Sequence, residues 1–282
     1  MAGHIETIDF RGLPALRLST AAGASAVLTL YGAQLVSWMP ARSQERLYLS
    51  EQAVCDGRSP IRGGVPVCFP QFAAEGRLPR HGFARTMSWS VIEQRAGDDF
   101  ALATLTLSDD PDTRAHWPHR FNLELTAAIE DGRLDIELAV HNRGHASFAF
   151  AAALHTYLRV TEVETCQLEG LYGFEYRDAL DGNTLRRESG DVLRVEAALD
   201  RVYHNVSRPL LLRDDGGALG IHAQGFPDVV VWNPWEDGLT RCTDMAPGDF
   251  RRMLCVEAAA VRERIDLPPE QSWVGRQTLV AL

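Results

Sequence analysis

The sequence lacks the cysteine pattern of a disulfide-stabilised or zinc-binding protein. Its five cysteines, at positions 55, 68, 166, 242 and 255, are an odd number and include no C-x-x-C pair. This usage is typical of reduced, mostly buried thiols. The sequence also has no basic start followed by an apolar segment, and no apolar run approaches the ~20 residues that cross a bilayer. We therefore expect a cytoplasmic protein with no membrane partner.

Positive charge is scarce as well. The 282 residues hold 38 acidic against 28 basic side chains, a formal net charge of -10, and the pI is near 5.4. This balance argues against nucleic acid as a partner. The composition, 45% hydrophobic and 23% charged, is that of a globular protein with a large core. No linker-like tract or fixed-period repeat divides the chain, so we expect a single domain over residues 1–282, and a monomer.

Several catalytic motifs are missing too. There is no G-x-G-x-x-G or Walker sequence for a nucleotide, and no G-x-S-x-G for a serine hydrolase. The pairs His116 and His119, and His141 and His145, do not lie on a helix that would give them the spacing of zinc ligands. These absences argue against a nucleotide enzyme, a serine hydrolase and a zinc site.

What the sequence has in plenty is short alternating segments. Apolar and polar side chains alternate over residues 121–129 and 134–140, and Asp131-Gly132 between them is a hairpin signal. Other turn-bounded segments of strand character are 25–38 (two strands around a bend at Gly32), 87–93, 100–107, 147–160, 192–195, 210–213, 219–222, 229–232, 253–260 and 273–282. Helical periodicity nowhere exceeds a turn or two. The pattern predicts an all-β protein, a sandwich or barrel.

An arginine-rich stretch, IRGGVPVCFPQFAAEGRLPRHGFAR, occupies residues 61–85. It holds Arg62, Arg77, Arg80, Arg85, His81 and four glycines. Its prolines argue against a helix, and glycine lets the backbone approach a ligand closely. Arginine presents a planar fork of donors that fits phosphate or carboxylate. The stretch is consistent with a loop-built pocket wall for an anion; alternatively, its arginines are solvated or paired with surface acids.

Two further side chains are unusual for their surroundings. His155 interrupts an apolar segment, and alternation places it on the face of Ala151, Ala153 and Tyr157, where small side chains leave room for a ligand. Glu257 stands in the apolar run of RRMLCVEAAAV, where burial would raise its pKa toward the range of a general base. The alternatives are a hydrogen-bonded core histidine and a glutamate tied to an arginine.

Two clusters lie between these residues. The segment VVVWNPW (residues 229–235) carries Trp232, whose indole could stack on a sugar ring, although core packing is the commoner role of tryptophan. Asp200, in the segment DRVYH, could accept hydrogen bonds from sugar hydroxyls; taken alone it is more typical of a turn.

Together these segments resemble the aldose 1-epimerase (galactose mutarotase-like) superfamily, and within it the glucose-6-phosphate 1-epimerase branch. The similar segments are IRGGVPVCFPQF (61–72), LPRHGFART (78–86), ALHTYLRV (153–160), LDRVYHN (199–205), VVVWNPW (229–235) and MLCVEAA (253–259). They extend over nearly the whole chain. The resemblance implies a large antiparallel β-sandwich.

The resemblance also implies roles for individual residues. His155 would be the general acid and Glu257 the general base of a ring opening and reclosure that exchanges the anomers of a hexose 6-phosphate, without metal or cofactor. Arg62 and Arg85 would hold the phosphate of this small-molecule substrate. Asp200 and His81 would contact the sugar. Arg80, where relatives can carry a glutamine or another short residue, would add a phosphate contact or point to solvent.

Three other functions are compatible with these residues. One is a mutarotase for unphosphorylated aldoses, in which the arginines are structural. Another is a non-catalytic sugar-phosphate sensor, although such a module has no need of an acid–base pair. The third is a carbohydrate-cleaving enzyme, for which the chain looks too short to carry an additional catalytic domain.

Overall fold

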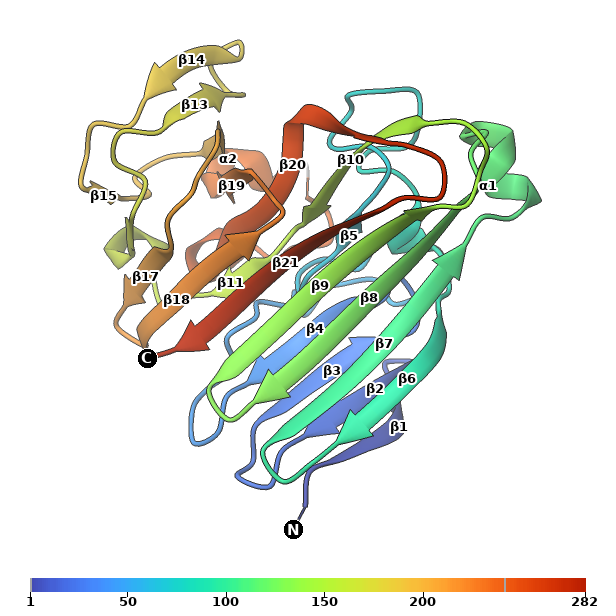
Figure 1. Cartoon of the computed structure of the whole chain (residues 1–282). Helices are drawn as coiled ribbons and strands as arrows, with labels where there is room; N and C mark the ends of the chain where they lie inside the picture. Colours follow the sequence, from blue (N-terminus) through green and yellow to red (C-terminus); the bar gives the residue numbers. More distant parts are fainter. Residues whose placement is uncertain (1, 241) are drawn as a thin grey trace.

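Antiparallel strands build almost all of the protein. The computed structural model describes residues 2–240 and 242–282, and their strands form three sheets (Figure 1). The nine-stranded sheet has the order β15 (Val192–Leu193), β12 (Gln167–Glu169), β17 (Leu210–Asp214), β18 (Gly217–Gln224), β21 (Ser272–Ala281), β9 (Arg133–Asn142), β8 (Phe121–Glu130), β7 (Phe100–Ser108), β6 (Ser90–Ala96). The eight-stranded sheet has the order β14 (Thr184–Arg187), β13 (Glu175–Asp178), β16 (Leu199–Tyr203), β19 (Asp228–Asn233), β20 (Met253–Leu267), β10 (Phe148–Leu154), β5 (Val67–Cys68), and β11 (Tyr157–Arg159) also pairs with β20. The four-stranded sheet runs β1 (His4–Phe10), β2 (Leu13–Ser19), β3 (Ser25–Thr29), β4 (Gln34–Met39).

Helices are few and short. The α-helices described are α1 (Pro111–His116) and α2 (Trp235–Leu239), with 3₁₀ turns at Ala84–Thr86, Val163–Thr165 and Asp249–Arg252. Asp110 caps α1 by accepting the backbone N–H of Thr113, and Pro111 occupies the first turn, where its missing N–H costs nothing. No helix in residues 2–240 or 242–282 is long and apolar enough to cross a membrane.

The main core lies between the nine-stranded sheet and the other two sheets. It joins Leu125 of β8 to Leu28 of β3, and to Leu154 of β10 and Val256 of β20, all at most 1% exposed. Burial of side chains of this size stabilises the fold by roughly 1.5–3 kcal/mol each. The predicted all-β antiparallel sandwich is confirmed.

The hairpin of β8 and β9 shows why alternation was informative. Every second side chain of β8 is buried, and Glu130 pairs with Arg133 across the predicted turn at Asp131-Gly132. The segment 25–38 is also two strands, as predicted, because Gly32 and Ala33 adopt positive φ between β3 and β4.

The second face of the eight-stranded sheet carries a smaller cluster and leaves space above it. Ala151 and Ala153 of β10, Val202 of β16, Val230 of β19 and Ala259 of β20 belong to it. These side chains are small or of medium size, so ligand-sized room remains over the centre of the sheet.

Candidate active site

A pocket of about 400 Å³ occupies this second face, a volume within the ~300–1,000 Å³ typical of small-molecule sites. Its lining includes all eight candidate residues, Arg62, Arg80, His81, Arg85, His155, Asp200, Trp232 and Glu257. The floor comes from β16, β19 and β20, and one wall from the arginine-rich stretch, residues 61–85. Segments far apart in the sequence therefore converge on one space.

Strand register places the floor residues. Val230 of β19 lies opposite Glu257 of β20 and Val202 of β16, and Trp232 lies opposite Asp200 one row further along. Because side chains alternate between the faces of a sheet, these residues all point to the pocket side. Asp200 thus lies within a strand, and the turn alternative is wrong.

His155 occupies a break between two strands. The prediction of one strand over 147–160 is wrong here, because β10 ends at Leu154 and β11 begins at Tyr157. The backbone N–H groups of His155 and Tyr157 donate to the carbonyls of Pro66 and Gly64, at 3.0 and 2.9 Å. The arginine-rich stretch therefore takes over the strand's hydrogen bonds and fixes His155 at the pocket.

Two glycines let this stretch lie close to the sheet. A Cβ on Gly64 would stand 2.1 Å from the carbonyl oxygen of Leu35, and one on Gly82 would stand 2.1 Å from that of Phe69. Both glycines also adopt positive φ, which L-residues rarely do. The I-R-G-G and H-G-F segments are consequently shaped by backbone contact.

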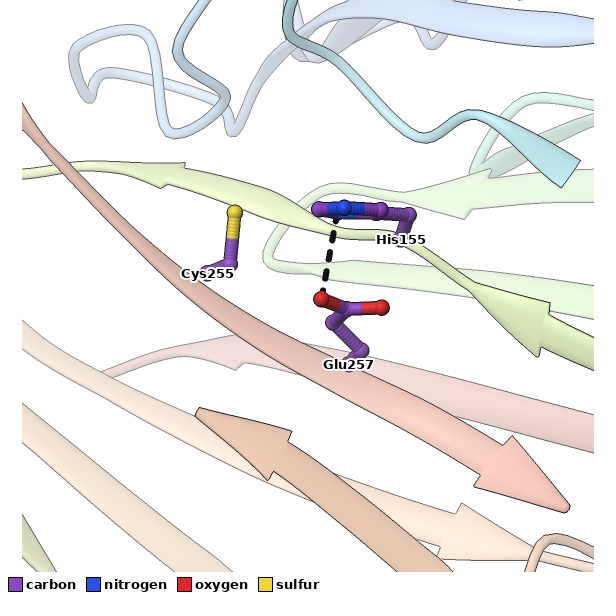
Figure 2. Close-up of side chains that lie close together, drawn as sticks. All are labelled: His155, Cys255 and Glu257. Carbon is purple, nitrogen blue, oxygen red and sulfur yellow. Dashed lines mark ion pairs between the residues drawn. The ribbon is translucent and has the colours of Figure 1, made fainter. Parts of the chain in front are cut away.

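His155 and Glu257 form a buried pair (Figure 2). Nδ1 of His155 lies 3.3 Å from Oε1 of Glu257, and the side chains are 9% and 1% exposed. Within the described residues, neither Nδ1 of His155 nor Oε2 of Glu257 has a hydrogen-bond partner. A buried polar group without a partner is unfavourable unless a ligand or a function uses it.

The surroundings move both pKa values toward the neutral forms. Burial, with the nearby Asp200, raises the pKa of Glu257 well above its ordinary value, against the opposing effect of Arg80 and Arg85. Burial also lowers the pKa of His155 well below its ordinary value, and the cationic groups around the ring add to this effect. A carboxyl with a raised pKa is suited to accept a proton near neutral pH.

Three aromatic rings hold the imidazole of His155. Tyr157 stacks on it with ring centres 4.7 Å apart and planes 10° apart. Trp232 and His81 contact it edge-on, at 6.0 and 5.3 Å. The ring is therefore fixed in orientation by packing.

His81 presents a defined edge to the pocket. Its Nδ1 accepts the backbone N–H of Ala73 at 3.3 Å, so in the neutral ring Nε2 carries the proton. Burial lowers the pKa of His81 to about 2 and keeps the ring neutral. His81 can consequently donate a hydrogen bond to a ligand oxygen.

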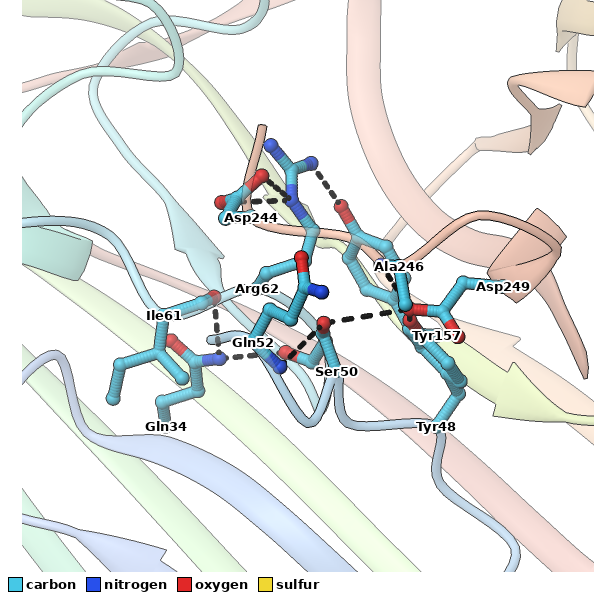
Figure 3. Close-up of polar contacts among 11 residues, drawn as sticks. Gln34, Tyr48, Ser50, Gln52, Ile61, Arg62, Tyr157, Asp244, Ala246 and Asp249 are labelled. Carbon is cyan, nitrogen blue, oxygen red and sulfur yellow. Dashed lines mark hydrogen bonds and ion pairs between the residues drawn. The ribbon is translucent and has the colours of Figure 1, made fainter. Parts of the chain in front are cut away.

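The pocket arginines fall into two groups. Among the described residues, Arg80 and Arg85 have no carboxylate within ion-pair distance; Arg85 donates to the carbonyl of Arg80 at 2.7 Å, and its buried Nε has no partner. Arg62 differs, because its Nε lies 3.1 Å from Asp244 and its Nη1 donates to the hydroxyl of Tyr157 at 3.1 Å (Figure 3). Arg62 therefore has fewer N–H groups free to bind a ligand than Arg80 and Arg85 have.

Sequence reasoning missed several pocket residues. Arg177 of β13 lines the pocket and pairs with Glu75 at 2.8 Å. Asp244 is 182 positions from its partner Arg62, so no local pattern could connect them. The chain contains no lysine, so all 28 basic residues are arginine, and the residue type alone does not distinguish a pocket arginine from a surface one.

His155, Cys255 and Glu257 bring three potential metal ligands within 4.8 Å of one another (Figure 2). A thiol must lose its proton to bind a metal. Burial, with Glu257 second, raises the pKa of Cys255 well above its ordinary value. Cys255 is also absent from the pocket lining. The donor chemistry therefore favours an acid–base pair over a metal centre.

Comparisons with known proteins agree with this geometry. A family model described as aldose 1-epimerase matches residues 14–279. A protein of Cenchrus ciliaris, provisionally named glucose-6-phosphate 1-epimerase, is 33% identical over 281 residues, which cover 96% of this chain and 85% of the relative. One of Escherichia coli (strain K12) with the same provisional name is 31% identical over 242 residues, 84% of this chain and 80% of that one. The crystal structure of a Salmonella typhimurium protein, provisionally named a mutarotase, superposes with a TM-score of 0.91 at 26% identity, covering 98% of this chain and 93% of that one.

Proposed function

The chain belongs to the aldose 1-epimerase family, and we propose that within this family it exchanges the α and β anomers of a hexose 6-phosphate, with glucose 6-phosphate as the first substrate to test. The epimerase activity follows from the family. The phosphate preference is the proposal. The observation that supports it is the position of Arg80 and Arg85 on the wall of the pocket that holds the His155–Glu257 pair, where neither guanidinium group has an acidic partner among the described residues.

Ring opening requires two proton movements at one end of the sugar. The hydroxyl on the anomeric carbon must lose a proton, and the ring oxygen must gain one. Glu257, with its raised pKa, takes the first proton, and His155 gives the second. Each transfer contributes roughly 10²–10⁴ in rate.

Reclosure uses the same two residues in reverse. Once the ring is open, rotation about the C1–C2 bond presents the other face of the aldehyde. His155 then removes the proton from the attacking hydroxyl, and Glu257 returns one to the new anomeric oxygen. The chemistry needs no electron transfer and no metal, so dialysis against a chelator should leave activity unchanged.

Other pocket residues hold the substrate. Asp200, buried on β16, accepts hydrogen bonds from sugar hydroxyls, and His81 donates one through Nε2. Trp232 of β19 packs against the sugar. Arg80 and Arg85 bind the phosphate, with the remaining nitrogen of Arg62 beside them.

One observation favours a second candidate function. Because Asp244 and Tyr157 already occupy two nitrogens of Arg62, part of the arginine wall is structural, as it would be in a mutarotase for unphosphorylated aldoses.

Two-dimensional exchange NMR distinguishes the two functions. The rate of α-to-β exchange is measured for glucose 6-phosphate and for glucose, each with and without the protein. Acceleration of the phosphorylated sugar alone supports the proposal. Acceleration of glucose alone assigns the second function, and acceleration of neither refutes both.

A further inference from the structure

The wall that carries Arg80 and Arg85 has an excess of positive charge. Both guanidinium groups line the pocket, and neither has a carboxylate within ion-pair distance among residues 2–240 and 242–282; Nε of Arg85 is buried with no hydrogen-bond partner. Burial lowers the pKa of Arg85, which shows the cost of its charge there. Arg80 is exposed and Arg85 is partly buried, and a partly buried cation such as Arg85 is stabilised by a bound anion. The wall is thus a site for an oxyanion even without a sugar attached.

The same positive charge acts on His155. The imidazole packs against Tyr157 of β11, Trp232 of β19 and His81 of the wall, and Glu257 and Cys255 of β20 lie beside it. The positive charges that act on it are those of Arg62, Arg80 and Arg85. Glu257 is the one carboxylate within ion-pair distance of the ring among the described residues. Each arginine disfavours protonation of the neutral His155 ring, because like charges repel strongly in a partly buried site.

This repulsion conflicts with the mechanism. To protonate the ring oxygen, His155 must first carry a proton itself, while Glu257 stays ionised as the base. Burial and the charge of the nearby arginines both oppose that state. A dianion beside Arg80 and Arg85 cancels their charge and removes that part of the opposition, while the effect of burial remains.

We propose that the Arg80–Arg85 wall is an oxyanion subsite separable from the sugar subsite, and that a free inorganic oxyanion bound there brings one proton onto His155 and activates the pocket toward unphosphorylated aldoses. The proposal rests on the proposed function, since it gives the substrate phosphate a second role besides binding. The proton comes from solvent and is used at the ring oxygen. Reclosure returns it to His155, so no co-reactant is consumed.

The first test measures glucose anomer exchange by NMR with increasing sulfate. Sulfate is a tetrahedral dianion and too weak a base to catalyse the exchange itself. We expect kcat/KM for glucose to rise by about tenfold, saturably, with no rise in sodium chloride of equal ionic strength. Arg85→Gln and, separately, Arg80→Gln should lose the stimulation. The matched control Arg95→Gln, on an exposed arginine of β6, should keep it.

Three results would overturn the inference. They are inhibition by sulfate, no effect of sulfate, and stimulation that persists in both wall variants. Glucose 6-phosphate in the same assay keeps the two proposals distinguishable. If its exchange is accelerated but sulfate does not stimulate glucose exchange, only the further inference fails; if it is not accelerated, the proposed function fails.

A second test measures the proton directly. Sulfate binding is followed by calorimetry at neutral pH in buffers with different ionisation enthalpies, which reports proton uptake. Wild type should take up about one proton per sulfate. His155→Gln should bind sulfate with little or no uptake. Equal uptake in both proteins, or none in wild type, would contradict the assignment of the proton to His155.

Discussion

The eight-stranded sheet contains two buried histidine–carboxylate pairs that look alike and do different things. Nδ1 of His155 is 3.3 Å from Glu257, and Nδ1 of His204 is 3.6 Å from Asp228. The side chains of the second pair are 4% and 2% exposed, so burial does not separate the two pairs. What separates them is how the carboxylate oxygens are used.

Asp228 completes the backbone hydrogen bonds of an irregular strand. The register of β10 with β20 jumps between Phe150 and Ala152, which leaves residues 261–264 of β20 without partners on β10. Oδ2 of Asp228 accepts the N–H groups of Val261 and Arg262, at 3.0 and 2.9 Å. This carboxylate is therefore a structural part of the sheet.

The carboxylate of Glu257 accepts no backbone N–H group within the part of the chain that the structure describes. Its Oε2 has no hydrogen-bond partner in the described residues, and its pKa is raised by burial. A carboxylate whose oxygens are satisfied by the protein stabilises the fold, whereas one left open toward a pocket is available to a ligand. The contrast can be tested by changing one member of each pair.

The largest effect is expected at the pair His155–Glu257, which we call the open pair because Oε2 of Glu257 has no hydrogen-bond partner in the described residues. Glu257→Gln and His155→Ala should each lower kcat for anomer exchange by roughly 10²–10⁴, because each removes one proton transfer. Glu257→Gln should unfold at the same or a higher urea concentration than wild type, since it replaces an unsatisfied buried carboxyl. Exchange NMR and urea titration measure the two quantities. Retained activity in Glu257→Gln would refute its role as the base.

At the pair His204–Asp228, in which Asp228 accepts two backbone N–H groups, a substitution should change the stability of the fold. Asp228→Ala leaves one buried and one partly buried N–H group without an acceptor and should lower the free energy of unfolding by about 3 kcal/mol. Asp228→Asn keeps one acceptor oxygen and should lose less. The activity of the folded fraction should stay within a few-fold of wild type. If Asp228→Ala lost activity as Glu257→Gln does while keeping its urea midpoint, the two pairs would not be different in kind.

A smaller effect is expected when the positive charge of an arginine near His155 and Glu257 is removed. Arg85→Gln should lower the ratio of kcat/KM for glucose 6-phosphate to that for glucose by about tenfold to a hundredfold, the equivalent of one charged hydrogen bond. Parallel kinetics on both sugars give the ratio, with Arg95→Gln as the control on an exposed arginine. An unchanged ratio would make Arg85 a structural residue.

The two pairs also show which contacts could be predicted from the sequence. His155 and Glu257 were found because each is a polar residue in an apolar segment, and the resemblance to a family gave them roles. The pairing of His204 with Asp228 depends on a register jump in a third strand, β10, which no local pattern records. The same limit hid the contact between Arg62 and Asp244.

Burial explains several of the strands that the sequence showed or hid, although the mostly exposed β6 was expected and the mostly buried β2 was not. Where one face of a strand is buried, as in β8, the sequence alternates and the strand was found. All four residues of β14 are exposed, and β1 has no fully buried residue, so neither strand leaves a hydrophobic pattern to read. The sandwich and most of the pocket were thus predictable, and the edge strands β1 and β14 were not.

The smallest effect is a difference in acid sensitivity. Burial lowers the pKa of His204, so below about pH 6.5 the unfolded chain binds a proton that the folded protein resists, and the free energy of unfolding falls. Glu257 has the opposite sign, because its raised pKa makes the folded protein hold a proton that the unfolded chain releases, which adds stability as the pH falls. Between pH 6.5 and 5.5, His204→Gln should therefore reduce the loss of stability by up to roughly 1 kcal/mol, whereas Glu257→Gln should increase it. Urea titrations of the three proteins at pH 7.5, 6.5 and 5.5 measure these slopes. Parallel slopes would mean that neither group changes its proton affinity on folding, and would remove the electrostatic basis of the contrast.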